Sequence, residues 1–125
     1  MEQRLLLLKQ SNVISERSYQ ATLNALPLLE ARFGVDEDNQ QYQMLVTHMA
    51  RAADRVLNGE QVEECLDDEV WLDIEQDEQF KELLELNAKL LALYGIDEAN
   101  QAETRFLVSN LFALSYAAQG EAQLC

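Results

Sequence analysis

The chain has 125 residues, which is enough for one domain with a hydrophobic core. Hydrophobic residues make up 48% of it, with only 1 proline and 4 glycines, and this composition favours an ordered helical domain over a β-sandwich or a disordered chain. The formal net charge of −14 argues against direct binding to nucleic acid or to anionic membranes, because both require a basic surface.

The first predicted helix covers residues 1–10, with the leucines at positions 5–8 on its buried side. This leucine run is too short for the apolar region of a signal peptide and far too short to span a bilayer. Cys65 and Cys125 have neither CxxC spacing nor a histidine nearby, so we predict no metal site and no disulfide framework. We therefore expect a cytoplasmic protein.

The second predicted helix begins after Ser15, a suitable N-cap residue, and extends towards Phe33. Pro27 lies inside this helical pattern and lacks a backbone hydrogen-bond donor, so we expect a kink or a break near Leu26. Gly34 is placed to cap the end of the helix in a left-handed conformation.

The third predicted helix carries His48 and ends at Gly59. The acidic run 36–38 is expected at its start, where the helix dipole favours negative charge. On a helical wheel His48 lies at the border of an apolar stripe. The members of this stripe are Tyr42, Leu45, Met49, Ala52, Ala53 and Val56.

Residues 60–82 are strongly acidic, which usually indicates a solvated face. We expect a connector there, followed by a short turn that places Trp71 and Ile74 on the core. Further helices are predicted over about 78–94 and 100–119. Their inward residues are predicted to be Phe80, Leu83, Leu84, Leu86, Leu90 and Leu91 in the first helix, and Phe106, Leu107, Leu111 and Leu114 in the second.

The sequence contains an internal repeat. Its matched segments are 31–40 with 92–101, and 45–49 with 107–111. Capping chemistry alone could produce the first match, but it does not account for the second. The repeat predicts a single domain over residues 1–125, an all-α antiparallel bundle of about five helices with two similar helix pairs. It also makes Asn110 the counterpart of His48.

His48 is the only histidine of the chain, and Arg51 and Arg55 follow it on the same side of the predicted helix. Imidazole can act as a nucleophile, a base or a metal ligand near neutral pH. Two guanidinium groups beside it suit a site that meets an anion, above all phosphate. The alternative is a half-buried histidine at the edge of the core with solvated arginines. An enzyme is not expected, because this histidine has no evident nucleophile and carboxylate partner.

The order of these patterns resembles the PTS-regulation domain (PRD), the helical module that bacterial sugar phosphotransferase systems phosphorylate on histidine. In the first half, Arg55 follows His48 by seven residues and Gly59 comes next. In the second half, Glu103 lies seven residues before Asn110, where the family has its second histidine. Between them lie the matching segments 70–74, 79–80, 84–94 and 95–96.

The resemblance implies that His48 accepts phosphate from a carrier of the phosphotransferase system, either the phosphocarrier HPr or an enzyme IIB. It implies supporting roles for Arg51 and Arg55, and it makes Glu103 and Asn110 the counterpart of a second site. A homodimer, contact with a partner regulator and a role in transcriptional or operon regulation are implied as well. No cofactor and no metal ion are expected.

Two departures from the family pattern matter. The family often has an acidic residue just before its first histidine, where this chain has Thr47, and the second histidine is Asn110 here. Because an amide cannot be phosphorylated, a scheme with two sites is reduced to one. The alternative function is therefore a degenerate PRD-like module that binds its partners without being phosphorylated.

Overall fold

The computed structural model describes residues 1–60, 67–97 and 99–124, with side chains described as far as residue 117. Within these ranges the chain is all-helical, as predicted, with six helices and no strand. The helices are α1 (Glu2–Gln10), α2 (Glu16–Phe33), α3 (Gln40–Leu57), α4 (Asp68–Glu75), α5 (Phe80–Leu93) and α6 (Gln101–Leu124). None of them is long and apolar enough to cross a membrane.

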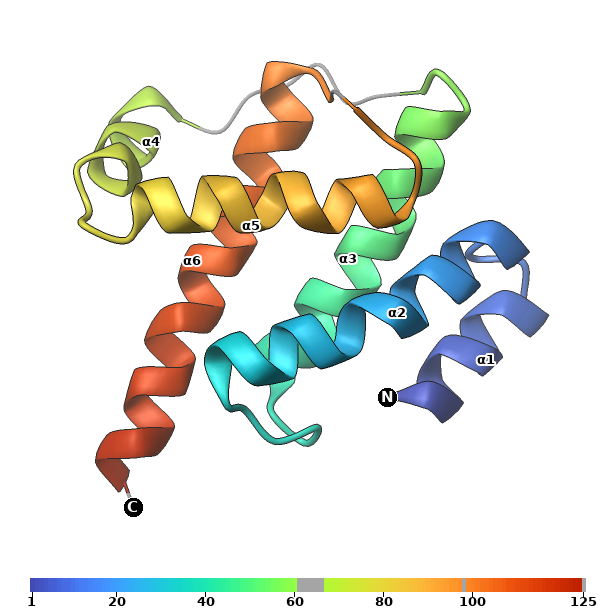
Figure 1. Cartoon of the computed structure of the whole chain (residues 1–125), viewed down its shortest axis with the longest axis horizontal. Helices are drawn as coiled ribbons and strands as arrows, with labels where there is room; N and C mark the ends of the chain where they lie inside the picture. The colour runs from blue at the N-terminus through green and yellow to red at the C-terminus, as the bar shows by residue number, and fades with distance from the viewer. Residues whose placement is uncertain (61–66, 98, 125) are drawn as a thin grey trace.

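Helix α3 packs between α2 and α6 (Figure 1). Helix α6 runs antiparallel to α3, and α5 crosses α6. Helix α1 packs on α2, and α4 packs on α6. The apolar stripe predicted for α3 is confirmed, with Val56 partly buried and the other members buried: Tyr42, Leu45, Met49, Ala52 and Ala53. The border of this stripe, where His48 was expected, therefore lies beside a neighbouring helix.

The predicted start of α2 is confirmed. The Ser15 side-chain oxygen accepts a hydrogen bond from the backbone N–H of Ser18 (3.0 Å). Of the kink or break expected near Leu26, the break does not occur, because α2 continues as one helix through Pro27. The proline removes one backbone hydrogen bond, and the burial of Leu26 and Leu29 on the same helix offsets that loss.

The connection from α2 to α3 differs in part from the expectation. Gly34 caps α2 as predicted, with a left-handed φ of 61°. The acidic run 36–38 lies before α3, and the first turn of that helix contains no acidic residue. The helix begins later because Asn39 is its N-cap, with the side-chain oxygen accepting a hydrogen bond from the backbone N–H of Tyr42 (2.9 Å).

Trp71 and Ile74 are buried as predicted, but they belong to a helix, α4, and not to a turn. The Asp67 side chain caps this helix by accepting a hydrogen bond from the backbone N–H of Glu69 (2.8 Å). Acidic residues in the first turn favour the helix further. Residues 61–66 of the predicted connector lie outside the described residues.

Helix α5 buries Leu83, Leu90 and Leu91 as predicted. The prediction that Leu84 points inward is wrong, because this side chain is 39% exposed. Asn87 takes an inward position instead and is only 5% exposed. Leu83 points to the middle of the face of α5 that the other helices cover. Because neighbouring residues of a helix point about 100° apart, Leu84 lies outside that covered face.

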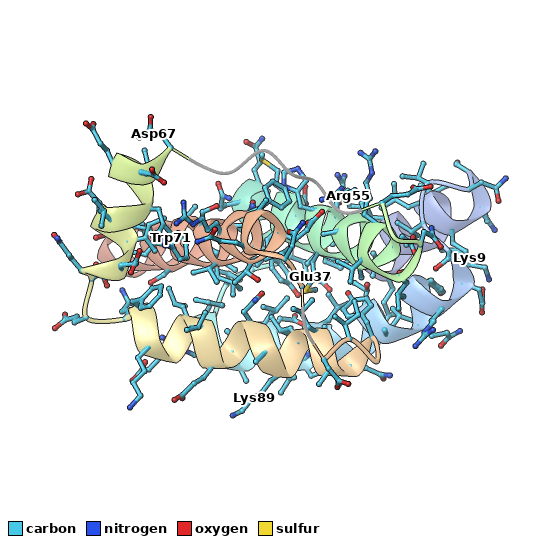
Figure 2. The ribbon with its side chains drawn as sticks, turned by 90° about the horizontal axis from the view of Figure 1, so that it is seen from above. Lys9, Glu37, Arg55, Asp67, Trp71 and Lys89 are labelled. Atoms are coloured by element: carbon cyan, nitrogen blue, oxygen red, sulfur yellow. The ribbon has the colours of Figure 1, made fainter. Side chains whose placement is uncertain are left out.

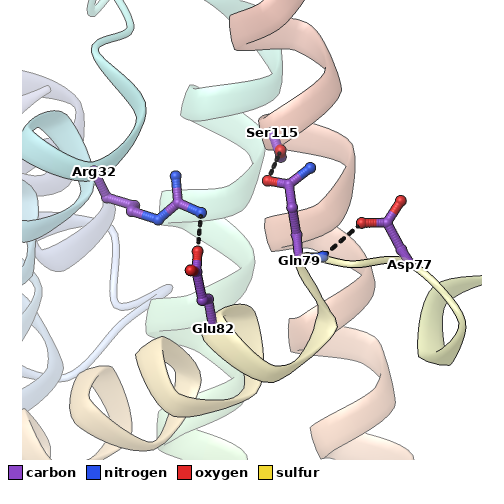
Figure 3. Close-up of polar contacts among 5 residues, drawn as sticks. All are labelled: Arg32, Asp77, Gln79, Glu82 and Ser115. Atoms are coloured by element: carbon purple, nitrogen blue, oxygen red, sulfur yellow. Dashed lines mark hydrogen bonds and ion pairs between the residues drawn. The ribbon is translucent and has the colours of Figure 1, made fainter.

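Polar contacts fix the start of α5 against its neighbours (Figure 3). The Ser115 hydroxyl on α6 donates a hydrogen bond to the Gln79 side-chain oxygen (2.7 Å), and the Gln79 backbone N–H donates to the Asp77 carboxylate (2.9 Å). On the other side, Arg32 of α2 pairs with Glu82 of α5 (3.3 Å). The leucines predicted to lie inward on α6 are all buried: Leu107, Leu111 and Leu114.

Candidate functional site

The candidate site lies where α3 and α6 meet, and we call it the α3–α6 seam. It consists of His48 and Arg55 from α3 with Glu103, Phe106 and Asn110 from α6. His48 contacts Asn110. Further along the seam, towards the end of α3, Arg55 contacts Glu103. Arg55 lies seven residues after His48, and Glu103 lies seven residues before Asn110. Because the two helices run antiparallel, both pairs can meet. The two positions that the internal repeat makes equivalent therefore face each other.

The hydrogen bonds around Asn110 determine which nitrogen of His48 carries a proton. The Asn110 side-chain N–H donates to the backbone carbonyl of Phe106 (2.8 Å), and a carbonyl can only accept. The amide oxygen of Asn110 therefore faces His48 Nδ1 at 3.3 Å. Since this oxygen can only accept, Nδ1 is the donor. In the neutral imidazole the Nε2 atom then has a free lone pair.

His48 is also packed against an aromatic ring. The centroids of the His48 and Phe106 rings are 5.4 Å apart, with an angle of 37° between the ring planes. The His48 side chain is half-buried. The tilted contact with Phe106 and the hydrogen bond at Nδ1 together hold the ring in one orientation. Phe106 was predicted only as an inward residue of α6, because nothing in its local sequence indicates contact with a residue of α3.

Arg55 is held by an ion pair with two hydrogen bonds. Its Nε donates to one carboxylate oxygen of Glu103 at 2.9 Å and its terminal nitrogen to the other at 3.1 Å. The Glu103 side chain is completely buried, whereas that of Arg55 is 28% exposed. The guanidinium also lies 5.7 Å from the centroid of the Phe106 ring. The charge of Arg55 is therefore already balanced by a buried carboxylate.

Arg51 differs from Arg55, although both follow His48 on α3. Its side chain is exposed, and it makes no hydrogen bond or ion pair with any residue that the structure describes. Arg51 is thus free to meet an incoming anion. A third guanidinium, unexpected from the sequence, reaches the residue next to His48: Arg4 Nε donates to the Thr47 hydroxyl at 3.1 Å. No local signal predicts this contact between α1 and α3.

A depression of about 520 Å³ lies beside the seam, at the end of α3. Arg51, Asp54 and Arg55 line it together with the loop before α2, whereas His48 is not part of its lining. The Asp54 carboxylate accepts hydrogen bonds from the Ser15 backbone N–H (2.9 Å) and the Ser15 hydroxyl (2.6 Å). It accepts a third from the hydroxyl of Ser18 in α2 (2.7 Å). This carboxylate therefore joins α3 to the start of α2.

The described part of the chain holds no group of three or more histidine, cysteine, aspartate or glutamate side chains that could bind a metal ion. The chemistry available is thus that of one imidazole and one paired arginine in the seam, with the exposed Arg51 beside it. Such a set can accept an electrophilic group at Nε2 and compensate negative charge beside it.

The uncharacterized protein YhfY of Escherichia coli strain K12 is 31% identical over 121 residues, which cover 97% of this chain and 99% of that protein. No family model matches the sequence. No solved structure matches it either.

Proposed function

The chain belongs to the same family as YhfY, and we propose that it is a PRD-like regulatory module that accepts one phosphate on His48. The donor is a phosphocarrier of a sugar phosphotransferase system, either HPr or an enzyme IIB. The phosphate then controls contacts of this cytoplasmic protein with a partner regulator, and through them transcription or operon expression. The protein is proposed to act as an acceptor and not as an enzyme.

The observation that carries the proposal is the contact between His48 Nδ1 and the Asn110 amide oxygen at 3.3 Å, from which we infer that the lone pair is on Nε2. The Asn110 oxygen holds the proton on Nδ1, so the nucleophilic nitrogen is the one turned away from this hydrogen bond. Without such a partner the two tautomers would interchange, and Nε2 would carry a proton for part of the time. Asn110 is thus proposed to have a positioning role, where the PRD pattern has its second histidine.

In the proposed transfer, the Nε2 lone pair attacks the phosphorus of a phosphohistidine or phosphocysteine on the carrier. The new N–P bond forms while the P–N or P–S bond of the carrier breaks, and the carrier side chain leaves with the electron pair. Arg51 lies on the next turn of α3 and is free, so its guanidinium is suited to neutralise the phosphoryl oxygens. Arg55 keeps its pairing with Glu103 and holds the seam together.

The proposed regulatory effect follows from electrostatics. A phosphoryl group brings about 1.5 to 2 negative charges to a half-buried ring between two packed helices. In a chain with a net charge of −14, this addition favours a rearrangement of the seam or of a surface that covers it. The PRD resemblance supports this function, and so does the contact between His48 and Asn110, the residue that the sequence repeat makes its counterpart.

The test is the intact mass of the protein before and after incubation with phosphoenolpyruvate, the general phosphotransferase enzyme and HPr or an enzyme IIB. We expect a gain of one phosphate that is lost on mild acid treatment, as phosphohistidine is. No gain, while a known acceptor is phosphorylated in the same mixture, would contradict the proposal. It would favour the alternative, a PRD-like binding module that is not phosphorylated.

We also propose that the module is a homodimer, as the PRD resemblance implies. Light scattering coupled to size exclusion is expected to give twice the mass of the chain at micromolar concentration. A monomer at that concentration would contradict the idea that phosphate acts on an interface between subunits, without bearing on whether His48 is the acceptor.

A further inference from the structure

The arginines of this chain fall into two groups. Those of the first group are each held by a carboxylate or a backbone carbonyl from another part of the fold: Arg17, Arg32, Arg55 and Arg105. The second group, Arg4 and Arg51, makes no ion pair with any residue that the structure describes. The chain has 23 acidic residues against 9 lysines and arginines, so two guanidinium groups without a carboxylate are unexpected.

These two arginines are neighbours on the outer face of α3, the side that carries Thr47 and Arg51. Arg4 Nε donates a hydrogen bond to the Thr47 hydroxyl (3.1 Å). Arg51 lies four residues after Thr47 and therefore one turn further along the same side of the helix. Arg4 and Arg51 are both exposed, and the terminal nitrogens of Arg4 make no hydrogen bond with a described residue. Both guanidinium groups thus have N–H donors available beside Thr47.

His48 borders this outer face. Viewed along α3, Arg51 is rotated by about 40° from Thr47, and His48 by about 100° in the same direction. Thr47 contacts α1, whereas His48 contacts α6. Arg51 therefore lies between the part of α3 that faces α1 and the seam.

The carboxylates closest in the fold have other partners or point elsewhere. Asp54 accepts hydrogen bonds from the serines at the start of α2, and Glu103 pairs with Arg55. Glu2 precedes Arg4 by two residues and therefore points to the other side of α1. No described carboxylate neutralises either of the two exposed guanidinium groups by direct contact.

Space for a small molecule continues from Arg51 into the depression of about 520 Å³ at the end of α3. Small-molecule sites commonly have a volume of this order. Asn12 and Asn58 belong to its lining, and their side-chain amides make no hydrogen bond with a described residue. Glu60 lines it as well. Because an amide offers both a donor and an acceptor, this lining suits the polar part of a ligand.

We propose that the outer face of α3 binds a small polar phosphate ester. Its phosphate group lies between Arg4 and Arg51, and the rest of the molecule extends into the depression towards Asn12 and Asn58. The planar forks of two guanidinium groups match phosphate oxygens. A phosphate monoester carries about 1.5 to 2 negative charges, which two arginines balance, whereas a carboxylate would balance only one of them.

This site does not depend on phosphorylation of His48, although Arg51 belongs to both proposals. The binding test therefore uses the full chain with the substitution His48→Ala, which has no histidine to accept a phosphoryl group. Failure of phosphate transfer and failure of ester binding are thus separate results.

The experiment titrates inorganic phosphate, glycerol phosphate and glycerol separately into this isotope-labelled chain at neutral pH and constant ionic strength. NMR follows the arginine Nε–H signals and the backbone amides. Both phosphates are expected to give saturable shifts at Arg4, Thr47 and Arg51, and glycerol is expected to give none. Glycerol phosphate should bind more tightly and should also shift the side-chain amides of Asn12 and Asn58.

Two results would overturn the proposal. The first is the absence of saturable shifts at Arg4 and Arg51 with either phosphate, or their appearance on another face. The second is equal binding of the two phosphates without shifts at Asn12 and Asn58, which would exclude the depression as the place of the ester.

Variants in the same background separate a site from a general effect of charge. Arg4→Met and Arg51→Met each remove one guanidinium group and should weaken phosphate binding about tenfold. Lys89→Met is the matched control, because it removes the same charge from an exposed position on α5, on the opposite side of the molecule from Arg55 (Figure 2). It should change binding by less than about twofold, since salt screens distant charges. Thermal melting verifies that each variant is folded, and equal binding by Arg51→Met and Lys89→Met would overturn the proposal.

Discussion

Replacing Arg55 with methionine is expected to lower the free energy of unfolding by about 3 kcal/mol. The substitution keeps most of the apolar length of the side chain but removes both hydrogen bonds to Glu103, whose carboxylate is completely buried. A buried carboxylate that loses its charged partner keeps a cost of desolvation that the ion pair had offset. Urea unfolding followed by circular dichroism at neutral pH measures the change.

The matched control is Arg51→Met on the same helix. Arg51 is exposed and has no partner among the described residues, so its loss should change the free energy of unfolding by less than about 0.5 kcal/mol. The double variant Arg55→Met with Glu103→Gln should be more stable than the sum of the two single effects, because the two side chains interact directly. Similar stabilities of Arg55→Met and Arg51→Met would contradict a structural role for the ion pair.

Replacing His48 with alanine is expected to abolish phosphate transfer, and replacing Asn110 with leucine is expected to slow it about tenfold. The first substitution removes the acceptor, because the chain has no other histidine. The second keeps the acceptor but removes the oxygen that holds the proton on Nδ1. Transfer rates are measured by intact mass at several times after addition of the phosphorylated carrier.

Ser109→Ala is the matched control for Asn110→Leu. Ser109 precedes Asn110 on α6 and also donates a hydrogen bond to the Phe106 carbonyl (2.7 Å), but it is not a hydrogen-bond partner of His48. Its loss should leave the transfer rate within about twofold of wild type. Unchanged transfer in Asn110→Leu would remove the positioning role of Asn110, and unchanged transfer in His48→Ala would remove His48 as acceptor.

Much of the fold could be predicted from local sequence, because caps and apolar periodicity are local properties. Ser15 and Gly34 mark the ends of α2 as expected. Where tertiary packing competes with local preference, the prediction failed. Pro27 does not break α2, since Leu26 and Leu29 of the same helix are buried. Leu84 is exposed and Asn87 is buried, because the apolar pattern of α5 does not tell which side its neighbours cover.

The candidate site could be predicted only in part. The repeat gave Asn110 as the counterpart of His48, and the structure adds that the two residues touch. From the sequence we predicted the same supporting role for Arg51 and Arg55, because both lie on the same side of α3. Their difference depends on Glu103, which lies 48 residues from Arg55 and meets it only because α6 runs antiparallel to α3. Side-chain partners that are distant in sequence are set by packing, which periodicity does not reveal.

The identity of the phosphorylated nitrogen decides whether His48 accepts phosphate as proposed. The protein is phosphorylated by the phosphotransferase relay at alkaline pH, and phosphorus NMR against the two phosphohistidine isomers then identifies the ring atom. We expect one phosphate, on Nε2 of His48. Phosphate on Nδ1 or on another residue, or no phosphate while the carrier is itself phosphorylated, would contradict it.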